Sequence, residues 1–429
     1  MKGLATIILV AALMVGCTCS EVISAIIPKR IESDEAAQKA WAAWRDGEVT
    51  KAEKLAIMLP GTSDIKHLLF LCCFVKGQYE AALDQYEKIR PSYDKFSNLD
   101  EPVIYAYFHL HRYTEAVEFA RKRNMEQKRL LKGLDMYAKT LLKVSLNKTI
   151  VIPFAKIPFK GYDLSDFFPG FDAELEGKKV TVHVDTGGTF LHMSPEQAKK
   201  LGIKLVEGPR VFASTKLQRC YLGIAKRFQL GEAVLENVPV VALPELTGEQ
   251  DFIIFGTNIL EQFLSTLDYP NRRLILSDRN DEALCKEHLQ MLPVKRFEVP
   301  FYMWGDRYMF ARGGYGNHKD LNFFIDSGLV DLGEDTQGRI RQACFETTPE
   351  FYQSWGVDPN ESKKKHFVSP LPISLGPLEQ ENQFFLSVKN TQGFGGVRIH
   401  GLLSHAFLKR YAWTLDFSQM KYIFAYKSD

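Results

Sequence analysis

The stretch that decides the fold is Gly177-Lys178-Lys179-Val180-Thr181-Val182-His183-Val184-Asp185-Thr186-Gly187-Gly188. A second copy follows later as Asn317-His318-Lys319-Asp320-Leu321-Asn322-Phe323-Phe324-Ile325-Asp326-Ser327-Gly328. In each copy a polar turn leads into an apolar run that is typical of a strand, and the strand ends in Asp-Thr-Gly or Asp-Ser-Gly. The duplication predicts two related halves, each of which presents one aspartate at the end of a strand.

Each half also contains a second matched segment, in the same order and at a similar separation. Residues 253–263 lead to Leu267-Asp268-Tyr269 in the first half, and residues 401–411 lead to Leu415-Asp416-Phe417 in the second half. A single Asp-Thr-Gly is a weak signal, because such an aspartate more often forms an Asx turn at a strand end. Two copies, each with its own supporting segment, are much more specific.

The paired segments resemble those of the pepsin/retropepsin superfamily of aspartic peptidases, which includes the bacterial aspartyl proteases. The resemblance runs from about residue 166 to the C-terminus. It implies an all-β, bilobal acid-protease domain with lobe 1 over residues 166–295 and lobe 2 over residues 296–429. It also implies that an apolar-apolar-Gly strand passes beneath each aspartate turn and holds it.

The same resemblance assigns roles to the two triplets. Asp185 and Asp326 are expected to be the catalytic residues, and the supporting residues are expected to be Thr186, Gly187, Ser327 and Gly328. The glycines allow tight turns toward the carboxylates, and the two hydroxyls are suited to bind across to the opposite loop.

Peptide hydrolysis without a covalent intermediate explains why two carboxyl groups are needed. One carboxylate accepts a proton from water while a protonated partner polarises the scissile carbonyl group. Two carboxyls that face each other cannot both ionise, so they share a proton. We therefore predict an aspartic endopeptidase that acts on a peptide or protein substrate and needs no metal and no organic cofactor. Both half-sites come from one chain, so we expect a monomer.

Three positions depart from the family pattern. Ser404 replaces the glycine that is expected under the second aspartate turn, which predicts altered packing there. Gly188 and Leu329 follow the triplets and carry no hydroxyl to bind the outer carboxylate oxygens. Loss of a donor to the ionised form raises the pKa of a carboxyl group, so we expect activity at mildly acidic to neutral pH. The alternative is a catalytically inactive, peptide-binding or scaffold lipoprotein of the same fold.

Residues 211–243 correspond to the segment that contains the flap of the resembled family, a hairpin that closes over the substrate. Tyr221 is a candidate for the aromatic residue of such a flap. A tyrosine in a strand is more often a packing residue, and the sequence leaves both interpretations open.

The N-terminus has the features of an export signal. Residues 1–16 combine one positive charge with an apolar stretch that is short for a membrane span. The stretch ends in Leu13-Met14-Val15-Gly16-Cys17, which resembles a bacterial lipoprotein box over residues 1–17. We expect lipidation of Cys17 and a protein of the cell envelope that is anchored to a membrane by this lipid. Plain signal cleavage and an uncleaved anchor are the alternatives.

Residues 34–146 are Ala-rich and show helical spacing of apolar residues. Ala52, Ala82 and Ala116 recur about 30 and 34 positions apart, each after a short polar or glycine-containing turn. This spacing is similar to that of tetratricopeptide repeats and predicts a helical array that offers a site for a protein partner. An irregular helical bundle is the alternative. His109 and His111 lie two apart and form a poor pair of metal ligands.

Composition excludes several other classes of protein. With 45% hydrophobic and 25% charged residues the chain is an ordinary globular protein, and a net charge of +2 gives no basic surface for nucleic acid. The 7 cysteines include no CxxC pair and no histidine at zinc spacing, so we expect no structural metal. Cys72 and Cys73 are expected to lie in apolar surroundings on one helix.

Overall fold

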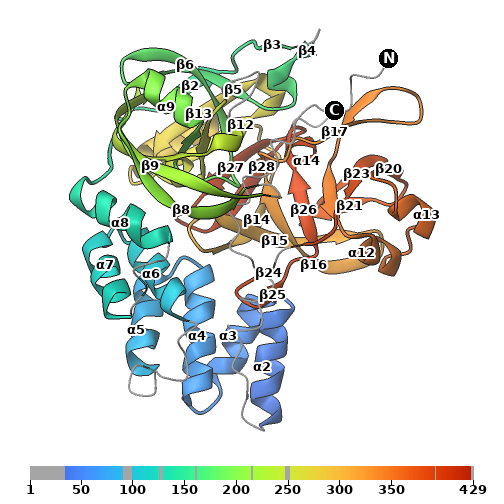
Figure 1. Ribbon diagram of the computed structural model, residues 1–429. Coiled ribbons are helices and arrows are strands. Elements are labelled where there is room, and N and C mark those ends of the chain that lie inside the picture. The colour runs from blue at the N-terminus through green and yellow to red at the C-terminus, as the bar shows by residue number, and fades with distance from the viewer. Residues whose placement is uncertain are drawn as a thin grey trace.

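The computed structural model of the protein describes a helical region followed by a two-lobed β domain (Figure 1). The described residues are 34–89, 99–123, 125, 129–159, 162–213, 216–246, 252–391 and 393–426. The predicted export signal and Cys17 lie outside these residues. The predicted class, an N-terminal helical region followed by a bilobal β domain, is confirmed.

The helical region consists of antiparallel helix pairs. Its helices are α2 (Glu35–Arg45), α3 (Val49–Ile57), α4 (Ser63–Val75), α5 (Tyr79–Ile89), α6 (Asp100–His109), α7 (Tyr113–Lys122) and α8 (Arg129–Lys139). Cys72 is buried and Cys73 half-buried on α4, and the cysteines of the described residues are all free thiols.

The turns within the first three helix pairs share one geometry. Gly47, Gly77 and His111 all adopt positive φ, at 73°, 72° and 56°. In each turn this residue donates to the carbonyl three residues back, and the next residue donates to the carbonyl five back, which satisfies the last carbonyls of the first helix. A fully buried alanine follows in each second helix, namely Ala52, Ala82 and Ala116. The predicted repetition is thus a structural one, while the assignment to tetratricopeptide repeats stays a prediction.

Lobe 1 is built on an eight-stranded sheet with the order β1-β10-β7-β11-β6-β5-β9-β8. Its strands are β1 (Lys143–Ser145), β5 (Gly170–Leu175), β6 (Lys178–Asp185), β7 (Leu191–Met193), β8 (Leu205–Ala213), β9 (Lys216–Leu230), β10 (Ala233–Ala242) and β11 (Ile253–Gly256). Short helices α9 (Pro195–Leu201), α10 (Thr257–Leu260), η3 (Leu164–Asp166) and η4 (Pro244–Leu246) connect them, and β3 (Pro158–Phe159) pairs with β4 (Tyr162–Asp163).

A 14-stranded sheet contains lobe 2 and the strands that join the lobes. The joining strands are β2 (Ile150–Pro153), β13 (Arg273–Asp278), β12 (Phe263–Asp268), β27 (Ala412–Asp416), β28 (Lys421–Ala425) and β14 (Arg296–Trp304). The lobe 2 strands are β15 (Tyr308–Tyr315), β16 (His318–Asp326), β26 (Gly401–Ser404), β19 (Phe345–Thr347), β23 (Gln383–Ser387), β20 (His366–Ser369), β21 (Ile373–Leu375) and β22 (Leu378–Gln380).

Smaller elements complete the β domain. They are the two-stranded units β17 (Leu332–Glu334) with β18 (Ile340–Gln342) and β24 (Gly393–Phe394) with β25 (Val397–Arg398), and the helices α11 (Glu282–Gln290), α12 (Pro349–Ser354), α13 (Pro359–Ser362), α14 (His405–Leu408) and η5 (Tyr269–Asn271).

The two matched supporting segments meet in the joining part of this sheet. β12 pairs antiparallel with β27, so that Leu267 lies opposite Trp413 and Ser265 opposite Leu415. The β domain also begins earlier than residue 166, because β1 pairs with β10 and β2 pairs with β13. Strand β1 therefore lies inside the range that the sequence predicted to be helical.

The helical region and lobe 2 share one hydrophobic core. The strand that ends at Asp326 alternates its faces, so Phe323 and Ile325 point into the core of the β domain while Phe324 packs with buried residues of the helices. Phe310 and Leu329 join the same helical cluster. The continuous apolar run before Asp326 thus reflects a strand that is covered on both faces.

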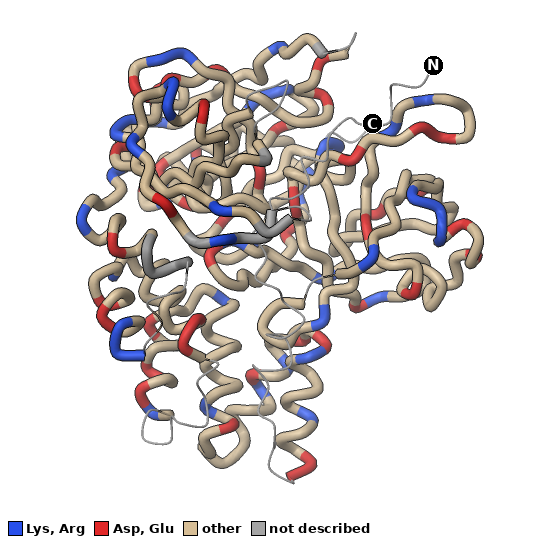
Figure 2. Tube along the Cα trace, viewed as in Figure 1, with Lys and Arg blue, Asp and Glu red and all other residues tan. Residues whose placement is uncertain are grey.

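Polar contacts fix the same junction. Trp44 Nε1 donates to the carbonyl oxygen of Gly395 over 2.9 Å, and Arg312 Nη1 and Asn322 Nδ2 donate to that of Asp46 over 2.7 and 3.1 Å. Figure 2 shows positive and negative residues interspersed along the helices and both lobes. Among the described residues, no helix has the length and apolar character needed to cross a membrane.

Gly47 lies where the helical region and lobe 2 approach each other closely. A Cβ atom on Gly47 would lie 2.3 Å from Asn322 Oδ1, whereas one on Gly77 would lie 3.0 Å from the flexible end of Met420. Both positions have positive φ, so alanine is strained at each. We expect Gly47→Ala to lower the free energy of unfolding by about 1–3 kcal/mol more than Gly77→Ala does, because only the first overpacks a buried contact. Urea denaturation measures both, and equal losses would contradict this description of the junction.

Candidate active site

Parallel strand pairs bring the two predicted aspartates to matched positions. β11 runs beside β6 with Gly256 opposite Asp185, and β26 runs beside β16 with Ser404 opposite Asp326. A Cβ atom on Gly256 would lie 2.0 Å from the carbonyl oxygen of Thr189, so only glycine fits beneath the first turn.

Ser404 occupies the position beneath the second turn and makes two hydrogen bonds through its hydroxyl. Its hydroxyl donates to the carbonyl oxygen of Ala343 and accepts from the backbone N–H of Ala406 over 3.0 Å, which caps the start of α14. The altered packing expected at this position thus takes the form of a helix cap.

Two hydroxyls brace the aspartate turns across the lobe interface. The backbone N–H of Ser327 donates to Thr186 Oγ1 over 3.0 Å, and that of Thr186 donates to Ser327 Oγ over 3.1 Å. Thr186 Oγ1 also donates to the carbonyl oxygen of Ile325 over 3.3 Å. All three contacts join lobe 1 to lobe 2 and are buried, so the two turns are held in one relative position.

The two carboxyl groups, called the aspartate pair below, lie against each other between these turns. Gly187 N–H donates to Asp185 Oδ1 over 2.7 Å, and Gly328 N–H donates to Asp326 Oδ1 over 2.8 Å. A Cβ atom on Gly187 would lie 2.5 Å from Asp326 Oδ2, and one on Gly328 would lie 2.1 Å from Asp185 Cγ. Each glycine therefore packs on the opposite aspartate, and no larger residue fits.

Burial raises the pKa values of both members of the pair, and the charge of Asp185 adds to the rise at Asp326. Both side chains are 0% exposed. Burial raises the pKa of Asp326 well above its usual value, and the charge of Asp185 and the hydrogen bond to it raise it further. Burial also raises the pKa of Asp185, against the opposing effects of the hydrogen bond from Asp326, the Gly187 N–H and the charge of Arg307. One proton shared between the two carboxyls satisfies this geometry.

One oxygen of each carboxyl group lacks a donor, and neither Gly188 nor Leu329 has a side-chain hydroxyl to supply one. Among the described residues, no N–H or hydroxyl of the surroundings donates to Asp185 Oδ2 or Asp326 Oδ2. These oxygens are the positions at which a water molecule or a substrate carbonyl group could bind the pair.

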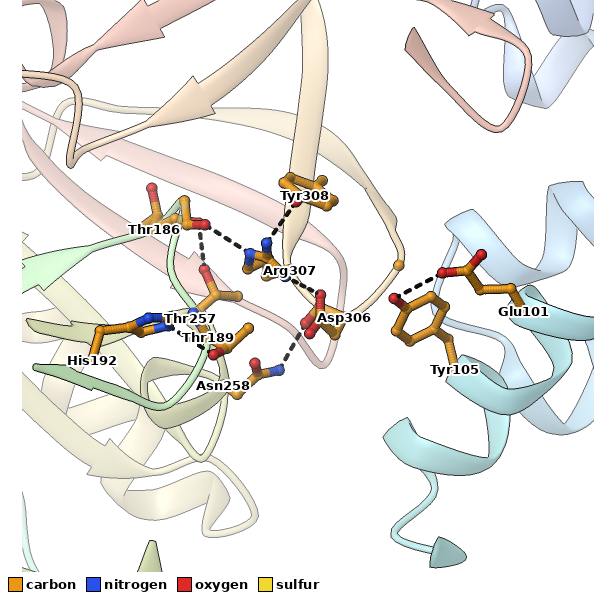
Figure 3. A network of polar contacts seen from close by, with 12 residues as sticks. Glu101, Tyr105, Thr186, Thr189, His192, Thr257, Asn258, Asp306, Arg307 and Tyr308 are labelled. Atoms are coloured by element: carbon orange, nitrogen blue, oxygen red, sulfur yellow. Dashed lines mark hydrogen bonds and ion pairs between the residues drawn. The ribbon is translucent and has the colours of Figure 1, made fainter. Parts of the chain in front are cut away.

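A second ring of contacts holds the first turn, through residues that the sequence had not singled out (Figure 3). Thr257 Oγ1 donates to the carbonyl oxygen of Thr186 over 2.7 Å, and Arg307 Nε donates to that of Gly187 over 2.8 Å. Thr257 directly follows Gly256, so its place in the supporting segment was a usable signal. Arg307 lies on the β14–β15 turn (residues 305–307), and its spacing from either aspartate gave no signal.

Tyr221 lies on β9, half-buried, opposite Glu207 of β8 and Ala242 of β10. β8 pairs antiparallel with β9, and the role of Tyr221 at a flap stays a prediction. His109 is buried against Glu261 and Gly305 and serves the domain junction. In the described part of the chain, no group of three or more His, Cys, Asp or Glu side chains is arranged to hold a metal ion.

Comparison with known proteins supports a protease. Residues 171–259, which carry Asp185 and Gly256, match the sequence model of a family described as aspartyl protease. This match confirms the resemblance to aspartic peptidases for the first half-site. No curated protein sequence matches the chain.

Two solved structures are similar to parts of the chain. One is a retropepsin-like aspartic protease from Rickettsia conorii, with 20% identity, coverage of 32% of this chain and 92% of its own, and a TM-score of 0.24. The other is an aspartic proteinase from Irpex lacteus, with 11% identity, coverage of 65% of this chain and 98% of its own, and a TM-score of 0.38. Likeness at this level says nothing about activity.

Removing one charge from the aspartate pair should stabilise the protein at neutral pH. The folded pKa of Asp326 lies above the unfolded value of 3.8, so the folded state loses stability as the pH rises through that range. We expect Asp326→Asn to raise the free energy of unfolding at pH 7 by about 0.5–2 kcal/mol, with the gain vanishing below about pH 3.8.

Asp268→Asn is the matched control for this experiment, measured by thermal unfolding across pH. Asp268 is equally buried, but it binds Arg273 over 2.7 Å and Asn271 over 2.8 Å. Its replacement should lower stability by about 1.5–3 kcal/mol. A loss of stability at pH 7 in Asp326→Asn would show that the two carboxyls are not in repulsive contact.

Proposed function

We propose that the protein is an aspartic endopeptidase that hydrolyses peptide bonds with water activated between Asp185 and Asp326. The observation that carries this proposal is the contact of two fully buried carboxyl groups, each packed on the glycine of the opposite turn. A charge that two buried carboxyl groups share is costly for stability, and such costs are typical of functional sites.

The proposed reaction uses the pair in its singly protonated form. The carboxylate accepts a proton from water, and the hydroxyl oxygen adds to the carbonyl carbon while the carboxylic acid donates its proton to the carbonyl oxygen. A tetrahedral diol forms in this way. Transfer of a proton to the amide nitrogen, with loss of a hydroxyl proton to the pair, breaks the C–N bond and releases a carboxyl and an amine product. No covalent enzyme intermediate is required.

A second candidate function is peptide binding without hydrolysis by the same fold. The observation in its favour is that neither carboxyl group has exposed surface, so water reaches the pair only after covering residues move. If Asp326 of lobe 2 did not take part in catalysis, the protein would bind peptides without hydrolysing them. The two candidates differ in one respect: only the peptidase releases cleaved peptide, and only there is that release lost when an aspartate is replaced.

Replacing either aspartate should abolish cleavage. We expect Asp185→Asn and Asp326→Asn each to lower kcat/KM by at least about 10³-fold, because the pair supplies both the base and the acid. The assay incubates the purified chain with a peptide library in H₂¹⁸O and detects new carboxyl termini that carry one ¹⁸O by mass spectrometry.

Asp320→Asn is the matched control for the loss of an aspartate. Asp320 lies on the same strand as Asp326, but its side chain is 82% exposed, and its positive φ is tolerated by asparagine. This variant should keep full activity. Cleavage that survives in both pair variants would refute the peptidase, and absence of cleavage in the wild type would favour the binding protein.

The pH dependence should be displaced upward from that of an ordinary carboxyl group. Activity rises as the lower pKa of the pair is passed and falls as the upper one is passed, and both values are raised above 3.8. We therefore expect a bell-shaped profile of kcat/KM with its maximum at mildly acidic to neutral pH. A maximum near pH 2 would contradict the missing donors at Gly188 and Leu329.

A further inference from the structure

The β14–β15 turn places a buried arginine beside the aspartate pair. Arg307 is 3% exposed, and its Nε donates to the carbonyl oxygen of Gly187 over 2.8 Å. The N–H of the same glycine donates to Asp185 Oδ1 over 2.7 Å. Arg307 and Asp185 are thus linked through Gly187, which binds both of them. Figure 3 shows the guanidinium group of Arg307 beside the turn that begins at Thr186.

The neighbours of Arg307 keep it charged and fixed. Its Nη1 donates to Asp306 Oδ1 and its Nη2 to Tyr308 Oη, each over 2.6 Å, and the guanidinium lies 4.3 Å from the centre of the Tyr308 ring. Burial disfavours the cation, but the charge of Asp306 and the hydrogen bond to its carboxylate raise the pKa of Arg307 overall. Arg307 is therefore a permanent cation at this site.

The charges around the two aspartates differ in sign. Burial raises the pKa of both aspartates, but the charge of Arg307 opposes this rise at Asp185, whereas the charges of Asp185 and Glu346 add to it at Asp326. Burial raises the pKa of Glu346 itself to about 7, so Glu346 contributes a charge only toward neutral pH. Glu346 of β19 lies opposite Leu402 of β26, and the matched position in lobe 1 is occupied by His192, opposite Ile254. Two lobes with the same strand plan thus surround their aspartates with different charges.

The turn that carries Arg307 is held from both sides. His109 Nε2 of α6 donates to the carbonyl oxygen of Gly305 over 2.9 Å, and Asn258 Nδ2 of α10 donates to that of Asp306 over 2.7 Å. One contact comes from the helical region and the other from lobe 1. The guanidinium therefore cannot follow small movements of the Gly187 turn and instead limits them.

We infer that Arg307 is a positioning residue that clamps the Gly187 turn and makes Asp185 the ionised member of the pair, while Asp326 holds the proton. This inference rests on the proposed peptidase function. In that reaction Asp185 is the group that accepts the proton from water, and Asp326 is the group that donates to the carbonyl oxygen.

Two charge changes of opposite sign test the inference. Arg307→Gln removes the cation, so the acid limb of the kcat/KM profile should move up by about 1 pH unit. Asp306→Asn removes the anion that partly neutralises Arg307 and keeps the side-chain acceptor, so the acid limb should move down. A purely structural role predicts lower kcat for either variant, with no opposite displacements of the limb.

Two further variants separate charge from geometry. Arg307→Lys keeps the charge but loses the planar set of donors, so the acid limb should stay in place while kcat falls by about 10–100-fold. Arg312→Gln is the matched control, because Arg312 on β15 also donates to a backbone carbonyl, that of Asp46, but on the side of the helical region. It should leave the acid limb unchanged. Should Arg307→Gln fail to fold, Asp306→Asn and Arg307→Lys still decide the matter.

An infrared titration distinguishes failure of this inference from failure of the proposed function. The carboxyl band of Asp185, obtained as wild type minus Asp185→Asn, should titrate at higher pH in Arg307→Gln and at lower pH in Asp306→Asn, whether or not any peptide is cleaved. Absence of cleavage by the wild type would refute the proposed peptidase function but not the role of Arg307. Unchanged titration in both charge variants, or displacement of both in the same direction, overturns the role of Arg307.

Discussion

Two buried carboxyl groups repel each other unless one proton lies between them, and the surrounding backbone must hold them together against that repulsion. Two crossed hydrogen bonds hold the turns together here. The hydroxyl oxygens of Thr186 and Ser327 each accept a hydrogen bond from the backbone N–H of the other residue. Gly187 and Gly328 leave room for the opposite carboxyl. Pairing of β12 with β27 also holds the two lobes in one relative position. The aspartate turns, which lie one on each lobe, are therefore held together both at the site and through the sheet.

The lobes share a strand plan but bury its second face differently. In lobe 1, His183 on β6 stacks on Phe168 at 4.5 Å, so a local loop covers that face. In lobe 2, the matching face of β16 is covered by the helical region, with whose buried residues Phe324 packs. The helices are therefore part of the core beneath one of the two aspartates, and they also reach the site through His109 and the turn that carries Arg307. The helical region thus contacts both the core of lobe 2 and the turn beside the aspartate pair.

Much of this arrangement was predictable from local patterns. The duplicated triplets and their supporting segments predicted two lobes, the meeting of Asp185 with Asp326, and the roles of the adjacent glycines and hydroxyls, because each signal lies within a few residues of the aspartate it serves. The lack of a hydroxyl at Gly188 and Leu329 is consistent with one carboxyl oxygen of each aspartate having no donor. The start of the β domain was placed too late, since β1 is a strand of three residues at the edge of the sheet, and its place depends on pairing with the distant β10.

The order of residues alone therefore specified which side chains form the aspartate pair, because a strand, a turn and a glycine are encoded by neighbours in the chain. Folding in three dimensions decided which charges surround the aspartate pair, because Arg307 and Glu346 come from separate elements and no spacing along the chain links them to the aspartates. It also decided that the helices complete lobe 2. Long-range electrostatics and shared burial depend on distances between elements, and these exist only once the sheets and helices have packed.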